Sequence, residues 1–318
     1  MSYCRSILWG CFYGVFFAGG LVLAQNQPKI IGLMPVRNEE NYVAQTLRAL
    51  SLYTDAIVVL DDASDDSTVK IIEQLAQECR IQKIIKKETW YRDEPGDRNK
   101  LLLAGRELGG THFICLDADE MVTSNCLEAG FLRKRILELN PGEKLTMVWI
   151  LLWRDIHQYR FDTSVWTSNY GDPIFCDDGE CFYLSDFIHT SRTPAGLKGE
   201  VKRIEGYAHG VLHFQFVNWR NLLIKQAWYR CLEKIRIPEK SVDEINQRYA
   251  PSKDETNLGV RISPVEWFSG YTFFDARDFN KPEGWREKQV VGWFDYYGKD
   301  YFSGLDIGDI NWGEGLKK

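Results

Sequence analysis

The sequence of 318 residues lacks the short motifs of several large enzyme classes. It contains no GxxxxGK[ST] loop and no GxGxxG turn, which argues against P-loop NTPases and dinucleotide-binding enzymes. No CxxC pair occurs among its eight cysteines, so neither a zinc ribbon nor a disulfide framework is indicated. Cys176 and Cys181 alone lie close in sequence, and we interpret them as two unlinked cysteines of one loop. The paired histidines of HGVLH lack the glutamate of the HExxH zinc proteases.

An excess of positive charge is also missing. The formal net charge is -6 and the pI is about 5.5, which argues against a nucleic-acid partner. Hydrophobic residues make up 44% and charged residues 26%, the usage of ordinary globular proteins. A chain of this length forms one large domain or two smaller ones with ample core.

A long apolar run occurs once, at the N-terminus. Residues 7–24 are uncharged and follow Arg5, and the small residues of Val22-Leu23-Ala24 precede Gln25. The run is at the short end for a bilayer-spanning helix. We interpret residues 1–25 as either a cleaved signal peptide or an uncleaved signal-anchor, which places the protein at a membrane or in an export or secretory pathway. The rest of the chain is expected to be soluble.

From Lys29 onward, strand and helix patterns alternate. Apolar, β-branched runs at 29–34, 56–60, 81–85 and 112–117 predict strands. Helical spacing of apolar residues predicts helices around 43–50 and 69–75, and the run at 97–110 predicts a helix closed by glycine. This alternation predicts an α/β fold with a doubly wound, mostly parallel sheet and flanking helices.

Polar clusters follow three of these strands: PVRNEE, DDASDDST and DADE. Ligands of such sheets bind beyond the carboxyl ends of the strands, so the three clusters are expected to converge at one edge. Asp117, Asp119 and Glu120 crowd negative charge there, which requires a positive partner. Asp117 and Asp119 offer the oxygen ligands that Mg²⁺ or Mn²⁺ prefers, and Arg37 and Arg98 suit phosphate oxygens.

The four blocks PVRNEE, VVLDDASDDST, DRN and LDADE, in this order and spacing, resemble family 2 glycosyltransferases with the GT-A fold. The resemblance is close over residues 29–125. It continues more loosely through FIHTSRTP and the segment LHFQF to NWRNLLIKQAWYR, ending near residue 234.

This resemblance implies a nucleotide-diphosphate sugar donor, a divalent cation held by Asp117 and Asp119, and transfer with inversion at the anomeric carbon. A hexosyl group is the expected cargo, and the acceptor is a hydroxyl of a glycan, lipid or protein. The resemblance further implies that the donor nucleoside is held by the first loop and the second-strand aspartate. These residues are Pro35, Arg37, Glu39 and Asp61.

Inverting transfer requires a general base, which the resemblance places downstream of the DxD. The acidic residues of YGDPIFCDDGECFYLSD are the candidates: Asp172, Asp177, Asp178, Glu180 and Asp186. We favour Asp178 and then Asp177, because a short acidic loop precedes an aromatic, strand-like run. An acidic surface turn around Gly179 is the alternative interpretation.

Several basic side chains have two interpretations each. His213, at the end of a strand-like run, is a candidate third metal ligand, and His189 and Arg192 are candidates for the acceptor loop. Lys225 and Arg230 are candidates for diphosphate contacts. A structural role, or a solvated helix face for the last two, is the competing interpretation in every case.

We expect a catalytic domain at 28–235 and a C-terminal extension at 236–318 that packs on it and is rich in aromatic residues from Trp267 to Trp312. Two other functions are compatible with such a sheet. A nucleotidyltransferase usually has a glycine-rich basic loop after the first strand, and PVRNEE has no glycine. A non-catalytic nucleotide-sugar binder would keep DADE but need no base.

Overall fold

The computed structural model describes residues 27–164, 167, 169–184, 190–308 and 310–313. The N-terminal run interpreted as a signal or anchor lies outside these residues, as do Asp186 and His189. Within the described ranges, no helix is both long and apolar enough to cross a bilayer.

The first third of the chain alternates strands and helices, as predicted. Its elements are β1 (Ile30–Val36), α1 (Val43–Ser51), β2 (Ala56–Asp61), α2 (Thr68–Leu75), β3 (Ile81–Lys86), α3 (Glu94–Glu107) and β4 (His112–Cys115). The strands pair in parallel in the order β3-β2-β1-β4. The predicted α/β class with a parallel sheet is confirmed.

Helices cover both faces of this half-sheet because its strands are apolar on both faces. Ile30 and Met34 of β1 pack with α1 and α2. Ile31 and Leu33, which alternate with them, pack on the other face with Leu101 of α3. Because both faces of the sheet are buried, the polar residues of this region lie at the ends of the strands.

The sheet continues with strands of mixed direction. The following elements are β5 (Glu120–Val122), α4 (Phe131–Leu137), β6 (Lys144–Leu151), β7 (Gln158–Arg160), β8 (Tyr170–Cys176), β9 (Val201–Arg203) and β10 (Gly210–His213). Beyond β4 the order is β8-β6-β10-β5, and β9 pairs with β6. β8 is antiparallel to both β4 and β6, whereas β10 is parallel to β6.

These directions decide which residues meet at each edge of the sheet. The carboxyl ends of β1, β2, β4, β6 and β10 share one edge, and the carboxyl end of β8 lies at the opposite edge. β5 is antiparallel to β10, so its first residue, Glu120, pairs with His213. The DADE turn and the end of β10 are thereby placed side by side.

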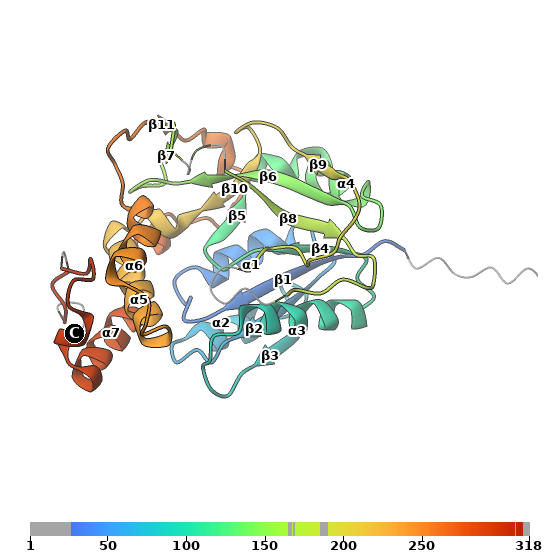
Figure 1. The fold of residues 1–318 in the computed structure, drawn as a ribbon. Helices are drawn as coiled ribbons and strands as arrows, with labels where there is room; N and C mark the ends of the chain where they lie inside the picture. Colours follow the sequence, from blue (N-terminus) through green and yellow to red (C-terminus); the bar gives the residue numbers. More distant parts are fainter. Residues whose placement is uncertain (1–26, 165–166, 168, 185–189, 309, 314–318) are drawn as a thin grey trace, which may run out of the picture.

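The C-terminal part is α5 (Trp219–Arg236), α6 (Val242–Tyr249), β11 (Val260–Ile262) and α7 (Trp285–Tyr297), with β11 pairing with β7. Short 3-10 turns lie at Ser124–Gly130, Phe214–Phe216, Ala250–Ser252, Val265–Trp267, Asp278–Asn280 and Lys299–Phe302. In Figure 1, α5, α6 and α7 stand together at one end of the sheet, away from the N-terminal trace.

Aromatic residues join this region to the rest of the molecule. Trp228 of α5 packs with Tyr249, Phe294 and Phe302 in one core cluster. Trp267 packs with residues of the sheet in another. The extension is therefore built into the core of the molecule.

The described cysteines are free and buried, Cys176 and Cys181 among them. The interpretation of these two as unlinked cysteines is confirmed.

Candidate active site

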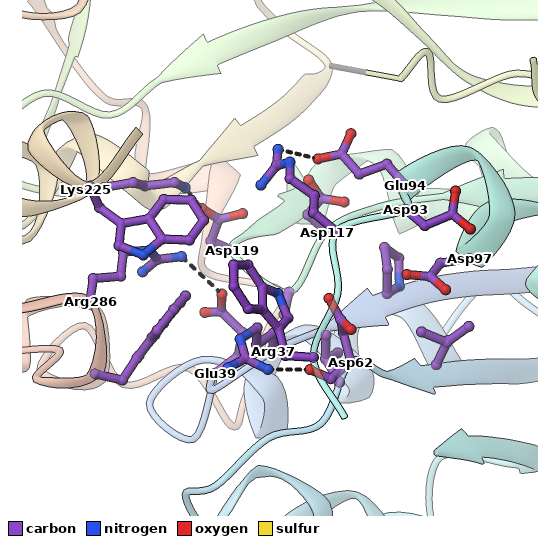
Figure 2. A pocket seen from close by; sticks show the side chains of 18 of the residues that line it. Arg37, Glu39, Asp62, Asp93, Glu94, Asp97, Asp117, Asp119, Lys225 and Arg286 are labelled. Carbon is purple, nitrogen blue, oxygen red and sulfur yellow. Dashed lines mark hydrogen bonds and ion pairs between the residues drawn. The ribbon is translucent and has the colours of Figure 1, made fainter. Parts of the chain in front are cut away.

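Two adjoining cavities open at the carboxyl edge of the sheet. The first has a volume of about 170 Å³ and the second about 480 Å³. Both are lined by Glu94, Arg98, Asp117, Asp119 and Lys225. Figure 2 shows the first cavity, with Asp119, Lys225, Arg286 and Glu39 on one side and Asp62, Asp93 and Asp97 on the other. The parallel strands bring the three polar clusters together at this edge, as the sequence predicted.

Asp117 is held by two arginines. Its Oδ1 lies 3.3 Å from Arg98 and its Oδ2 lies 2.6 Å from Arg192. Burial by itself raises the pKa of Asp117, but Arg192 and Arg98 outweigh it, and the pKa falls below its usual range. Asp117 is therefore a carboxylate at neutral pH.

Asp119 is held by a lysine and a histidine. Its Oδ2 lies 3.3 Å from Lys225 Nζ and 3.5 Å from His213 Nε2. Burial opposes ionisation, yet the charges of Lys225 and His213 bring the pKa of Asp119 well below its usual value. The lysine in turn has a raised pKa: burial lowers it, but Asp119 outweighs burial.

Glu120 has a structural role in the turn. It is buried, and it accepts hydrogen bonds from the backbone N–H of Asp117 at 2.8 Å and from Trp149 Nε1 at 3.0 Å. Arg192 contacts it at 2.6 Å. The positive partners that the crowded carboxylates require are thus supplied, in this structure, by arginine, lysine and histidine side chains of the chain itself.

The donor set at Asp119 fits a divalent cation. Single ligand atoms of Asp119, Glu120 and His213 all lie within 4.8 Å of one another. A carboxylate oxygen and an imidazole nitrogen are ordinary ligands for Mn²⁺. Binding there requires Lys225 to yield its contact with Asp119, and Asp117 would join only by loosening its arginine pairs.

The first loop lines the smaller cavity through Pro35, Arg37 and Glu39. The guanidinium of Arg37 lies between two indole rings, 5.0 Å from the centroid of Trp90 and 5.2 Å from that of Trp285. It also donates to the carbonyl oxygens of Asp62 and Ala63. Arg37 is therefore fixed in the cavity wall, and burial lowers its pKa.

Asp61 is not part of the cavity wall, contrary to its predicted contact with the nucleoside. It is buried, and its carboxylate accepts from the backbone N–H of Ser64 at 3.2 Å, which closes the turn after β2. The next residue, Asp62, lines the cavity and pairs with Lys87 at 2.5 Å. We therefore transfer the expected nucleoside contact from Asp61 to Asp62.

The two residues predicted as the base, Asp177 and Asp178, lie away from both cavities. Asp177 and Asp178 follow β8, whose antiparallel direction carries them to the opposite edge of the sheet, where Cys176 pairs with His112. Asp177 forms a two-point ion pair with Arg106, with both distances 2.8 Å. Asp178 accepts from the backbone N–H groups of Glu180 and Cys181 and is part of an acidic surface turn. Neither residue lines either cavity.

Other predicted residues divide between the site and the scaffold. Arg192 and Lys225 line the second cavity, as does His213. Arg230 instead pairs with Asp306 at 3.3 Å, outside both cavities. Asp172 accepts from Thr146 at 2.5 Å on the sheet.

Sequence reasoning missed several lining residues. Glu94 lies four residues before Arg98, which the sequence did predict, and both residues share the face of α3 that lines both cavities. Trp90, Trp228, Trp285 and Arg286 line the smaller cavity. The spacing of Glu94 and Arg98 was readable in the sequence, whereas Trp285 and Arg286 come from a distant segment that no local pattern connects to the site.

Residues 33–132 match the family described as Glycosyl transferase family 2. No curated protein matches the sequence.

Among solved structures, the chain is similar to S. aureus TarS 1-349, with 15% identity, a TM-score of 0.40, and coverage of 71% of this chain and 70% of that one. It is also similar to the mannosyltransferase PcManGT from Pyrobaculum calidifontis in complex with GDP-Man and Mn2+, with 20% identity, a TM-score of 0.30, and coverage of 39% and 36%. Glucosyl-3-phosphoglycerate synthase from Mycobacterium tuberculosis, in complex with Mn2+, UDP and glucosyl-3-phosphoglycerate, matches at 19% identity and a TM-score of 0.28, with coverage of 45% and 50%.

The matched segment contains β1 to β4 and the DADE turn, which are the elements that form one wall of the cavities. The chain therefore carries a family 2 glycosyltransferase region on a GT-A-type α/β sheet, and the protein is a glycosyltransferase.

Proposed function

We propose that the protein is a metal-dependent, inverting glycosyltransferase that moves a sugar from a nucleotide-diphosphate donor to an acceptor hydroxyl. The observation that carries the proposal is the meeting of Asp119 and His213 beside the cavity lined by Arg37, Glu39 and Asp62. A donor bound in this cavity would place its negative charge between the basic side chains, such as Arg37, and the cation site at Asp119.

Asp119 and His213 hold the divalent cation, with Asp117 as the next oxygen ligand. A cation bound there would supply positive charge against the negative charge that develops on the departing nucleoside diphosphate. Arg98 and Lys225 line both cavities and contribute positive charge to the same leaving group.

We assign the general base to Glu94 instead of Asp178. The carboxylates that line the larger cavity, among the described residues, are Glu94, Asp117 and Asp119, and the latter two face the cation site. Glu94 Oε2 accepts from the backbone N–H of Thr190 at 3.0 Å, which fixes the carboxylate at the cavity wall. Glu94 takes the proton of the acceptor hydroxyl as that oxygen bonds to the anomeric carbon and the bond to the diphosphate breaks.

The N-terminal segment belongs to the same proposal. Residues 7–24 direct the chain to a membrane system, and the enzyme begins near Gln25. N-terminal sequencing of the protein from its native host, combined with fractionation, tests this. An intact Met1 terminus in the soluble cytosolic fraction contradicts both the cleaved and the anchored form.

The experiment for the activity is a screen of nucleotide sugars for hydrolysis or transfer with and without Mn²⁺. We expect turnover of one donor class, loss of that turnover in EDTA, and a loss of about 100-fold or more in Asp119→Ala. Asp178→Asn is the matched control and should keep full activity, because Asp178 lies at the opposite sheet edge. Donor binding without any turnover identifies a binder, and release of pyrophosphate from a nucleoside triphosphate identifies a nucleotidyltransferase.

A further inference from the structure

The C-terminal extension supplies part of the wall of the smaller cavity. Trp285 and Arg286, the first two residues of α7, line it together with Glu39 of the first loop. They are more than 150 residues from the end of the family 2 segment, which stops at residue 132. In Figure 2, Arg286 and Lys225 approach the cavity from the same side, next to Asp119 and Glu39.

Arg286 is a buried cation whose neighbours only partly account for it. It pairs with Glu283 one turn earlier, and its Nη2 lies 3.9 Å from Glu39 Oε1, beyond hydrogen-bond distance. Glu39 Oε2 is buried and has no hydrogen-bond partner among the described residues. A guanidinium carries five N–H donors, so a pair with Glu283 alone leaves Arg286 able to donate to an anionic ligand in the cavity.

Arg286 and Lys225 line the same cavity and approach it from the same side (Figure 2). Burial opposes the charge of Arg286, but Glu283 and Glu39, and to a lesser extent Asp119, raise its pKa. Lys225 is a second cation on the wall of the same cavity. Two cations that repel each other across a cavity are stabilised by an anion that binds between them.

The indole of Trp285 adds a second feature. Its ring packs on Arg37 at 5.2 Å, and its Nε1–H is buried without a hydrogen-bond partner among the described residues. The extension therefore brings a free N–H donor and a guanidinium to one wall, which is the chemistry that recognises phosphate oxygens.

We propose that Arg286, carried by the C-terminal extension, binds the diphosphate of the donor opposite Lys225, so that the docked extension completes the donor site. The inference rests on the proposed function and adds to it a binding residue from outside the family 2 segment. Arg286 also approaches Glu39, so diphosphate binding and docking of α7 on the first loop are coupled.

The chain offers a matched control for the docking of α7. Arg220 of α5 pairs with Glu287 of α7 at 3.0 Å, and neither residue lines a cavity. Arg220→Gln loosens the same helix without touching the donor, whereas Arg286→Gln removes the cation from the cavity. Glu283→Gln is a third variant, which frees Arg286 from its neighbour and should strengthen diphosphate binding.

The test is calorimetric titration with UDP, GDP, CDP, ADP and dTDP, followed by the nucleoside of the tightest ligand. We expect Arg286→Gln to weaken diphosphate binding about tenfold or more and to leave nucleoside binding unchanged, since a charge-assisted phosphate contact is lost. Arg220→Gln should match the parent for both ligands, and Glu283→Gln should bind the diphosphate more tightly.

Equal diphosphate affinity in the parent and Arg286→Gln overturns the inference while the proposed function stands. Equal losses of affinity in Arg286→Gln and Arg220→Gln, for diphosphate and nucleoside alike, also overturn the inference. Such a result would show that Arg286 only holds α7 in place. If Arg286→Gln does not fold, Glu283→Gln decides, and unchanged or weaker diphosphate binding in that variant counts against the inference. A parent that binds none of the five diphosphates overturns the proposed function together with the inference.

Discussion

At Asp119, charges of both signs are concentrated in a small volume. The carboxylate faces Lys225 and His213 at 3.3 and 3.5 Å, and its neighbour Asp117 faces two arginines. Isolated charges in such a place would be costly, so each carboxylate is stable only with its partners. When cation and donor bind, these partners change roles, and the basic side chains become available to the phosphates.

We expect Asp62 to contribute to nucleoside binding and Asp61 to contribute to the stability of the fold. We expect Asp62→Asn to weaken binding of the free nucleoside diphosphate by about tenfold, because Asp62 lines the cavity. Asp61→Asn should lower the thermal midpoint, because Asp61 closes the turn after β2. Calorimetric titration and thermal unfolding of both variants check this. Unchanged diphosphate affinity in Asp62→Asn would contradict the placement.

Glu39 makes stability depend on pH. Burial, with Glu283 next, raises its pKa well above the usual 4.5. The native state therefore holds this proton more tightly than the unfolded chain, and stability falls as the pH rises from 4.5 through the folded-state pKa. We expect Glu39→Gln to be more stable than the parent at pH 8 by about 1–3 kcal/mol, with no difference near pH 4. Urea unfolding at both pH values measures this, and parallel pH profiles would show that Glu39 ionises freely.

At the level of elements, helix α3 brings the chemistry together. Asp93 caps its N-terminus by accepting from the backbone N–H of Gly96 at 3.1 Å. The first turns then direct Glu94 and Arg98 toward the cavities, while Leu101 and Leu102 anchor the helix on the sheet. A rigid, capped helix fixes both side chains relative to the DADE turn.

Glu94→Gln tests the base without disturbing this helix. We expect kcat to fall by about 10²–10⁴-fold with donor binding nearly unchanged, because the amide cannot accept the hydroxyl proton. Transfer kinetics and calorimetric titration with the donor measure both quantities, with Asp93→Asn as the comparison for a residue that serves the helix cap. A variant with the kcat of the parent would show that Glu94 is not the base.

On the scale of the whole molecule, the extension and the sheet share hydrophobic cores. Trp228 of α5 is buried against residues of α6 and α7, and Trp267 is buried against the sheet. The hydrophobic core therefore continues across the predicted domain boundary after residue 235.

We expect a chain that stops at residue 236 to lose cooperative unfolding. The truncated chain lacks α6 and α7, so Trp228, Cys231 and Leu232 of α5 become exposed. Burial of a large apolar side chain contributes about 1.5–3 kcal/mol to the free energy of unfolding. Calorimetry and dye binding to exposed apolar surface compare the truncated chain with residues 27–318. A sharp transition at the temperature of the longer chain would show that the catalytic part folds by itself.

The sequence by itself determined the parallel half-sheet and the position of Asp117 and Asp119 beyond β4. Apolar periodicity over 29–117 is local, and in a parallel sheet the carboxyl ends of the strands meet whatever else the chain does. For the same reason Pro35, Arg37 and Glu39 could be placed at the site.

Tertiary structure decided the rest. The antiparallel direction of β8 carried Asp177 and Asp178 to the far edge, and a strand's direction is set by its pairing partners, which no local pattern records. Arg192 and Lys225 reach Asp117 and Asp119 from 75 and 106 residues away, and Arg286 lines the same cavity from the distant helix α7. Charge balance in a buried site is satisfied by whichever elements the fold brings there.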